Sequence, residues 1–312
     1  MYYILYSLFF LVSLLPMRVL YFFADLMFLI VYHAIGYRRK VVMQNLRRAF
    51  PDKSETELHR IEKQFYHNMI DSFVETFKLI TASRNFLQKR VTANWDILKS
   101  LHESGRNCQV HLGHTFNWEW GQHVLQMNTG YQVLVVYSPL SSKSFERLML
   151  KIRTRFGSKF IRGTDMKSSI VQYNNVQYLL GLVADQSPAN PANAYWLNFL
   201  NQPTAFVPGP EKGARNNNLP VVYASVYKKR RGYYHAELSV ISEEPTQLKE
   251  GELTRRYAEL LEQNIRSHPE NWLWSHRRWK LAYKPEYLSQ WIGQDAPPVI
   301  TEEKSQTMKV AR

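Results

Sequence analysis

Residues 111–121, HLGHTFNWEWG, gather two histidines, a glutamate and three aromatic rings in one short stretch. Within it, His114 and Glu119 have the types and spacing for acid–base chemistry. We expect His114 at the end of a strand and a helix from about Phe116, so that the carboxylate can turn back toward the imidazole. A carboxylate on one ring nitrogen fixes the tautomer and stabilises the imidazolium that forms when the other nitrogen takes a proton. The pair therefore predicts a general base acting on a hydroxyl.

Two other kinds of chemistry compete with this interpretation. No serine or cysteine nucleophile stands beside the pair, which favours direct attack by an acceptor hydroxyl over a covalent acyl-enzyme. His111, His114, Glu119 and His123 are potential metal ligands, but their spacing differs from HExxH, in which both histidines lie on one helix face. We therefore expect neither a metal nor a cofactor, and we expect His111 and His123 to be hydrogen-bonded histidines of the core or surface.

The composition limits the partners. The chain has 312 residues, with 40 Lys and Arg against 26 Asp and Glu, a net charge of +14. Such an excess suits nucleic acid, anionic lipid headgroups or an acidic protein. The basic residues are dispersed rather than interleaved with aromatics in an RNA-binding motif, which argues against nucleic acid. The single Cys108 excludes an intrachain disulfide framework and suits a reducing compartment.

The N-terminus predicts membrane attachment. Residues 1–35 carry only two charged side chains, Arg18 and Asp25, and residues 19–35 are apolar over about one bilayer thickness. Residues 1–15 lack the basic start of a secretory signal. The basic residues 38–40 follow, so the positive-inside bias places the rest of the chain on the cytoplasmic side. One tilted span, a hairpin broken at Pro16 and an interfacial anchor all remain open, with a buried soluble helix as the alternative.

An amphipathic helix is expected next. Residues 38–50 alternate basic and apolar groups at helical spacing, which suits a helix lying on an anionic bilayer or, alternatively, an ordinary helix with a solvated basic face. Pro51 ends it. Ser54 and Glu57 then form a capping box, and the following helix has a stripe of apolar residues at steps of three and four that indicates core packing: Leu58, Ile61, Phe65, Met69, Phe73 and Phe77.

From about residue 105 the pattern predicts an α/β sheet covered by helices. Strands are expected at residues 107–112, 131–137, 178–184 and 219–227, and helices at 117–127, 141–156, 166–174 and 252–268. Residues 219–227 and 233–241 suit a hairpin. After residue 291 the chain turns polar, so we predict a disordered tail. The expected domains are an anchor (1–37), a catalytic domain that begins with amphipathic helices (38–285) and the tail (286–312).

Several motifs resemble those of a known family. Residues 114–119 resemble the H-x4-[D/E] signature of the lysophospholipid acyltransferase superfamily, in particular the H-x-G-N-W-E form of the bacterial lipid A biosynthesis (late, secondary) acyltransferases. Similar blocks follow the same order: Arg39 with NLRRAFP (45–51), FIRG (160–163), ADQSP (184–188), FVPGP (206–210) and HPENWLWSHRRWK (268–280). The last block is the most specific, and the resemblance covers roughly residues 15–282.

The resemblance implies a glycerolphosphate acyltransferase-like fold, with a central mixed sheet flanked by helices, and a reaction. His114 would deprotonate the acceptor hydroxyl, oriented and stabilised by Glu119. The acceptor would be a lipid A precursor, and the donor a fatty acyl thioester, usually on acyl carrier protein, an acidic partner that the positive charge would steer. Further substrate-binding candidates are Arg162, Asp185, Asn117, Arg277 and Arg278, with structural ion pairs or a solvated basic edge as the alternative. The expected location is the cytoplasmic face of a bacterial inner membrane.

One residue departs from the family pattern. The family usually has glycine two places after the histidine, where this chain has Phe116, and a bulky ring there would reshape acceptor selection. Alternative functions are therefore acylation of an aminolipid, a glycolipid or a pigment. A catalytically inactive membrane-surface binding protein is the alternative from another class.

Overall fold

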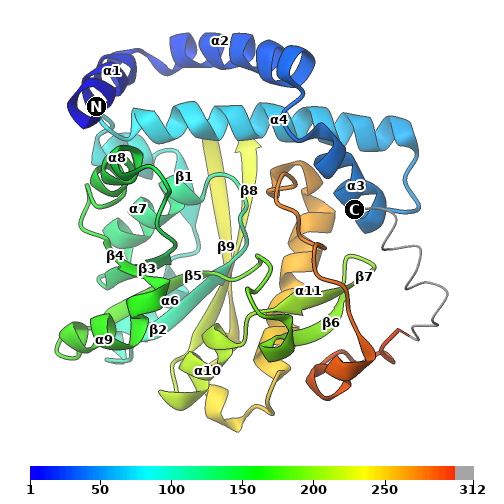
Figure 1. The fold of residues 1–312 in the computed structure, drawn as a ribbon. Helices are drawn as coiled ribbons and strands as arrows, with labels where there is room; N and C mark the ends of the chain where they lie inside the picture. Colours follow the sequence, from blue (N-terminus) through cyan, green and yellow to red (C-terminus); the bar gives the residue numbers. More distant parts are fainter. Residues whose placement is uncertain (299–312) are drawn as a thin grey trace.

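A mixed sheet of seven strands forms the centre of the protein (Figure 1). The computed structural model describes residues 1–298. The strand order is β1-β9-β8-β2-β5-β3-β4, which confirms the predicted α/β class with a mixed sheet flanked by helices. The strands are β1 (Val91–Ala93), β2 (Cys108–Leu112), β3 (Gln132–Tyr137), β4 (Lys159–Arg162), β5 (Tyr178–Val183), β8 (Val221–Arg230) and β9 (Tyr233–Ser242).

Strand direction determines where the site forms. The strands β8, β2, β5, β3 and β4 are mutually parallel, whereas β9 runs antiparallel to β8. Residues 108–111 of β2 are buried, as expected for an apolar parallel strand covered on both faces. Because β2 and β5 pair in parallel, with Leu112 opposite Val183, their carboxyl ends emerge at the same edge of the sheet. Ligand sites of open α/β sheets commonly form at that edge.

Three pieces of sheet were not predicted. The short strands β1 and β4 lie at the two edges of the large sheet, and β6 (Tyr195–Phe199) pairs with β7 (Gln202–Phe206) in a separate antiparallel sheet. The predicted hairpin of β8 and β9 is confirmed. Its turn contains Gly232, whose positive φ of 72° is easily adopted by glycine.

Helices cover the sheet and one end of the hairpin. The longest is α4 (Glu55–Lys78), and its predicted capping box between Ser54 and Glu57 is confirmed. The others in the body are α5 (Arg84–Gln88), α6 (Asp96–Glu103), α7 (Trp118–Asn128), α8 (Lys143–Arg153), α9 (Met166–Ile170), α10 (Gly209–Asn216) and α11 (Glu252–Ser267). Figure 1 shows α4 crossing above the end of the β8–β9 hairpin.

The basic helix α3 (Arg39–Ala49) forms as predicted, but its apolar face does not point to a membrane. Val42, Leu46 and Ala49 are fully buried in the main core of the protein. The interpretation of α3 as a helix lying on the bilayer by that face is therefore wrong. The alternative, an amphipathic helix packed on the body with its basic face in solvent, describes it.

The N-terminal segment consists of α1 (Tyr2–Leu14), a break at Pro16, α2 (Met17–Phe28) and a π-helix, η1 (Leu29–Ile35). Residues 17–35 are apolar and long enough to cross a membrane. The segment lies along α4, on the side of α4 away from the sheet (Figure 1).

The predicted tail begins inside packed structure. Pro285–Gln290 forms a 3-10 helix with Tyr287 buried, and the backbone nitrogen of Ile292 donates to the carbonyl of Trp196. The body therefore continues past the predicted boundary at residue 286. Residues 299–312 lie outside the described part of the chain.

Candidate active site

A histidine and an aspartate meet where β2 and β5 end. His114 follows β2 and Asp185 follows β5. The Nδ1 atom of His114 lies 2.5 Å from Oδ1 of Asp185, and the backbone nitrogen of His114 donates to Oδ2 at 2.8 Å. The carboxylate therefore holds both the ring and the backbone of His114, which is the contact the sequence analysis assigned to Glu119.

Asp185 is buried but remains a strong acid. Burial by itself raises the pKa of its carboxyl, but the His114 ring, the two hydrogen bonds from His114 and one from the Trp272 indole outweigh burial and lower the pKa to about 2. The indole nitrogen of Trp272 donates to Oδ2 at 2.6 Å. Asp185 is therefore ionised at neutral pH.

The second ring nitrogen of His114 is accessible. The side chain is 21% exposed, and the amide nitrogen of Gln186 lies 3.2 Å from Nε2. An amide N–H donates to the lone pair of Nε2, which places the ring proton on Nδ1, toward Asp185. In this tautomer Nε2 can accept a proton from a substrate hydroxyl.

The predicted hydrogen bond between Glu119 and His114 is not among the contacts of the described residues. The carboxylate of Glu119 is buried and accepts hydrogen bonds from Arg153, from Nε at 3.0 Å and from Nη2 at 2.5 Å. Glu119 instead reaches the histidine through Trp118. The Trp118 indole donates to Glu119 at 3.2 Å, and its ring meets the His114 ring edge to face, with centroids 5.5 Å apart. Arg153 competes for the carboxylate because α8, which carries it, packs beside α7.

Asn117 has a structural partner. Its side chain caps the N-terminus of α7 by accepting the backbone N–H of Trp120, and its amide donates to Oε2 of Glu75 at 2.7 Å. Asn117 is buried. The structure therefore gives it a role in holding the loop that carries His114, and its direct contact with substrate stays a prediction.

The three candidate arginines lie in different surroundings. Arg162 is exposed at the end of β4, with Nη2 3.9 Å from Glu146, and Arg277 is also exposed. Arg278 is buried and donates to the carbonyl of Ala205, so a contact with bulk lipid headgroups through this side chain is ruled out. Burial lowers the pKa of Arg278 to about 10, while Asp185 opposes that shift. Its guanidinium lies over the ring of Phe206, 4.6 Å from the ring centroid.

The other two histidines near the motif are buried. Nε2 of His111 accepts a hydrogen bond from the side-chain amide of Gln109 at 2.7 Å, as expected for a core histidine, and burial lowers the pKa of His111 to about 3. His123 lies in α7 and is not hydrogen-bonded as expected, because neither of its buried ring nitrogens has a partner among the described residues. Burial first, and the cations of Arg155 and Arg153 second, lower its pKa to about 3. Both imidazoles are neutral at physiological pH, and neither lies beside Asp185 as His114 does.

Phe116 is a core residue. Its ring is buried in the main core, stacked on Trp118 at 5.6 Å and tilted against Phe65 at 6.0 Å. Its burial argues against a direct contact between the ring and the acceptor, and an effect of Phe116 on acceptor selection stays a prediction. The backbone turns the residue after Thr115 inward, toward α4, rather than toward His114.

The C-terminal motif, residues 268–280, is hydrogen-bonded to the loop that carries His114. The backbone of Phe116 donates to Asn271 at 3.0 Å, and Leu273 donates to the carbonyl of His114 at 3.1 Å. Asn45 of α3 in turn donates to the carbonyls of Trp274 and His276. Trp272, the indole donor to Asp185, had no predicted role of its own within this motif. The signal for Asp185 as the partner of His114 was its place directly after a predicted strand.

Fold and site together define an α/β enzyme with a histidine–aspartate pair at the carboxyl edge of its sheet. Residues 1–281 match the family described as Bacterial lipid A biosynthesis acyltransferase, and the chain belongs to that family. It is therefore an acyltransferase of lipid A biosynthesis, and the family is membrane-associated. A comparison with curated proteins gave no match.

Proposed function

We propose that this protein transfers a fatty acyl chain from acyl carrier protein to a hydroxyl of a lipid A precursor, with His114 as the general base. The observation that supports the proposal most is the contact between Nδ1 of His114 and Asp185, which leaves Nε2 accessible. The proposed location is the cytoplasmic face of a bacterial inner membrane, which the basic residues 38–40 after the apolar segment support, because the cytoplasmic leaflet carries a negative surface potential.

The reaction is a single displacement on a thioester. Nε2 of His114 takes the proton of the acceptor hydroxyl as its oxygen attacks the thioester carbonyl carbon. Asp185 stabilises the imidazolium that forms. The tetrahedral intermediate then collapses, the carbon–sulfur bond breaks, and the imidazolium proton passes to the departing thiolate. The products are the lipid ester and the free carrier thiol, and His114 is neutral again.

Gln186 marks the place of the acceptor. Its amide contacts Nε2 of His114, the atom that must receive the substrate proton, and its side chain is exposed. We propose that the acceptor hydroxyl displaces this amide on binding. Glu119 then acts through Trp118 as a positioning residue, since its carboxylate is paired with Arg153.

The net charge of +14 supports an acidic donor. Complementary charge raises association rates and orients the partners before contact. Acyl carrier protein is strongly acidic, whereas coenzyme A offers a much smaller charged surface. The rate of acyl transfer from the carrier protein should therefore fall as ionic strength rises.

The decisive experiment combines the purified enzyme with labelled acyl carrier protein and a total lipid extract of the host. Mass spectrometry then identifies lipids that gain one acyl chain. His114→Ala should abolish that gain. The matched control is His59→Ala, because His59 is an exposed histidine of α4 whose contact is with Glu62.

Each result separates the candidates. A gain on a lipid A precursor that vanishes only in His114→Ala supports the whole proposal. An acyl chain gained by an aminolipid, a glycolipid or a pigment would show that the acceptor is not a lipid A precursor. A gain that survives His114→Ala would show that His114 is not the general base. No gain with carrier-protein or coenzyme A donors favours a membrane-surface binding protein.

A further inference from the structure

One side of the N-terminal helices contacts the rest of the protein, and the opposite side is exposed. We propose that α1, α2 and η1 lie flat in one leaflet of an anionic bilayer and do not cross it, so that the N-terminus stays on the same side as the catalytic body. This proposal rests on the membrane location proposed above, but not on the reaction.

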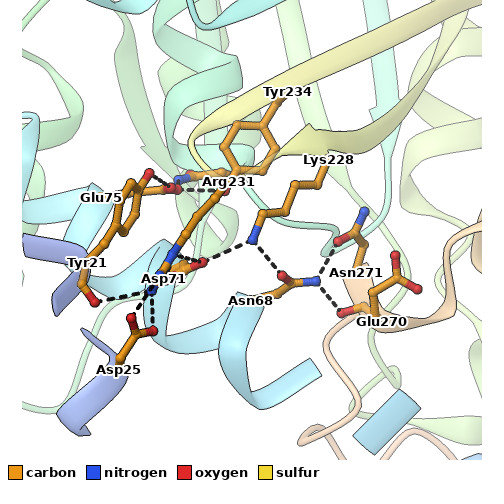
Figure 2. A network of polar contacts seen from close by, with 11 residues as sticks. Tyr21, Asp25, Asn68, Asp71, Glu75, Lys228, Arg231, Tyr234, Glu270 and Asn271 are labelled. Carbon is orange, nitrogen blue, oxygen red and sulfur yellow. Dashed lines mark hydrogen bonds and ion pairs between the residues drawn. The ribbon is translucent and has the colours of Figure 1, made fainter. Parts of the chain in front are cut away.

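The inner side of α2 is tied to the body by an ion-pair network (Figure 2). Arg231, in the turn of the β8–β9 hairpin, lies 2.7 Å from Asp25 of α2 and 2.7 Å from Asp71 of α4. Asp71 is buried and also pairs with Lys228 at 3.0 Å. Asp25 is one of two charged residues in the first 35, and its charge is thus matched by the body.

Hydrogen bonds fix two further points along the same helical stretch. The hydroxyl of Tyr21 donates to Glu75 at 2.6 Å, and Figure 2 shows this pair beside Tyr234. The hydroxyl of Tyr32 donates to Glu62 at 3.1 Å. Both acceptors are fully buried residues of α4. The helical stretch therefore contacts α4 directly at Glu62 and Glu75, and Arg231 joins it to Asp71 between them.

The helix α1 is held in the same way. The ammonium of Lys78 donates to the carbonyls of Ser13 and Leu15, which have no partner within the helix end, and the hydroxyl of Thr81 also donates to Ser13. The ring of Phe9 stacks on Phe77 with centroids 3.7 Å apart. α1 thus contacts α4, the helix that also binds α2, and it contacts α8 as well, where Arg147 lies over the ring of Tyr2 and Lys151 over the ring of Tyr6.

The outer side is predominantly apolar, with Ser7, Arg18 and His33 as its exposed polar residues. Ile4 is 74% exposed, Leu11 64%, Phe22 60% and Ile35 66%. The exposed residues follow steps of three and four, which place them on one face of each helix: Tyr3, Ile4, Leu8, Leu11 and Leu14 on α1, and Val19, Phe22, Phe23, Leu26, Leu29 and Ile30 on α2 and η1. An apolar face of this length is unusual for a water-exposed surface and suits the boundary of headgroups and acyl chains.

Exposed cations flank this face. Arg18 lies at the junction of α1 and α2, and Arg38 and Lys40 follow η1. Basic side chains beside an apolar face match the anionic headgroups of a leaflet. A lipid surface therefore fits both the apolar face and these exposed cations.

A spanning helix would break these contacts. Residues 17–35 can cross the bilayer only if α2 and η1 leave α4, which would separate Asp25 from Arg231 and place its carboxylate near the bilayer centre. Ionisable groups at that depth are costly. In the flat arrangement every one of the contacts above persists, and the acyl chains cover only the apolar face.

Nitroxide depth measurements distinguish the two arrangements. Single cysteines replace the exposed Leu8, Phe22 and Ile30 in the full chain, which is reconstituted in vesicles of phosphatidylethanolamine and phosphatidylglycerol. The exposed Val171, outside the segment, supplies the aqueous reference. Native Cys108 does not interfere because it is buried, and burial raises its thiol pKa to about 12. Electron paramagnetic resonance with lipid- and water-soluble relaxants then gives each label's depth.

The flat arrangement predicts that all three labels lie in lipid at one shallow depth, within a few ångströms of each other. A spanning helix separates positions 22 and 30 by about 12 Å along its axis, at about 1.5 Å per residue, and carries the series through the bilayer centre. That profile, or labels with no lipid contact, would overturn the proposal. Acyl transfer is measured on the same labelled proteins. Activity with a spanning profile refutes only the flat arrangement, whereas a flat profile without transfer refutes only the proposed function.

Discussion

The carboxylate of Asp185 lies 2.5 Å from the imidazole of His114, although 71 residues separate them in the chain. The contact exists because β2 and β5 are parallel neighbours, and each residue follows the carboxyl end of its strand. A third group, the indole of Trp272, fixes the carboxylate from the C-terminal motif. The residue that orients the base is thus set by strand order, not by spacing within the motif.

Asp185→Asn should lower kcat by about 10³- to 10⁴-fold while the protein stays folded, because a neutral amide neither stabilises the imidazolium nor holds the tautomer. Glu119→Gln should cost about tenfold, since Glu119 acts through Trp118. Steady-state acyl transfer and urea unfolding of both variants provide the measurement. A larger loss of kcat in Glu119→Gln than in Asp185→Asn would restore the direct histidine–glutamate pair.

Gly113→Ala should reduce both stability and activity. A Cβ at this position would lie 2.5 Å from Cδ1 of Leu261 and 3.2 Å from Oδ2 of Asp185. Leu261 is fully buried, so overpacking should cost about 1–3 kcal/mol in the free energy of unfolding and shift the carboxylate. The control is Gly121→Ala in α7, where no atom lies within 4 Å of the added Cβ. If both variants behave alike in denaturant unfolding and activity, the close approach at Gly113 has no role.

Stability should fall on acidification below about pH 6.5. The imidazoles of His111 and His123 have a pKa of about 3 in the folded protein, against about 6.5 for an ordinary histidine. Between these values the unfolded chain binds more protons, so each histidine lowers the free energy of unfolding as the pH falls, by up to about 1.4 kcal/mol per pH unit.

The variant His123→Leu isolates one of these contributions. Its free energy of unfolding should fall less steeply with decreasing pH than that of the wild type. The difference in slope should be at most about 1.4 kcal/mol per pH unit, the value for one bound proton. Urea unfolding of both proteins in the same detergent at pH 7, 6 and 5 measures the difference. Parallel slopes would show that His123 is protonated equally in the folded and unfolded states.

Glu75→Ala should destabilise the protein by about 2–4 kcal/mol, because it leaves several buried donors without an acceptor. Oε1 accepts the Tyr21 hydroxyl, and Oε2 accepts Asn117 at 2.7 Å and the Tyr234 hydroxyl at 2.7 Å. Burial raises the pKa of Glu75, so a neutral side chain of the same shape should be tolerated. Glu75→Gln is therefore the conservative partner and should retain most of the stability. Equal unfolding free energies in both variants would contradict the role of the carboxyl oxygens.

The sequence determined the elements with strong local signals. The capping box at Ser54, the hairpin of β8 and β9 and the apolar run of β2 all depend on neighbouring residues, so pattern and turn chemistry suffice to predict them. His114 as the candidate base also followed from its motif. The same reasoning missed β1 and β4, since a strand of three or four residues gains its stability from the sheet it joins.

Only the tertiary structure decided which side chains contact His114 and Glu119. Glu119 is near His114 in sequence, but Arg153 of a packed neighbouring helix takes its carboxylate, and strand order brings Asp185 to the ring instead. Likewise, only the tertiary structure shows that Phe116 is a buried core residue. The N-terminal segment shows the same division: its composition marks it as apolar, but only the contacts of Tyr21 and Asp25 with the body reveal which face remains uncovered. Long-range packing, ion pairing and desolvation join residues far apart in the chain, and spacing within a local motif does not determine which of these residues meet.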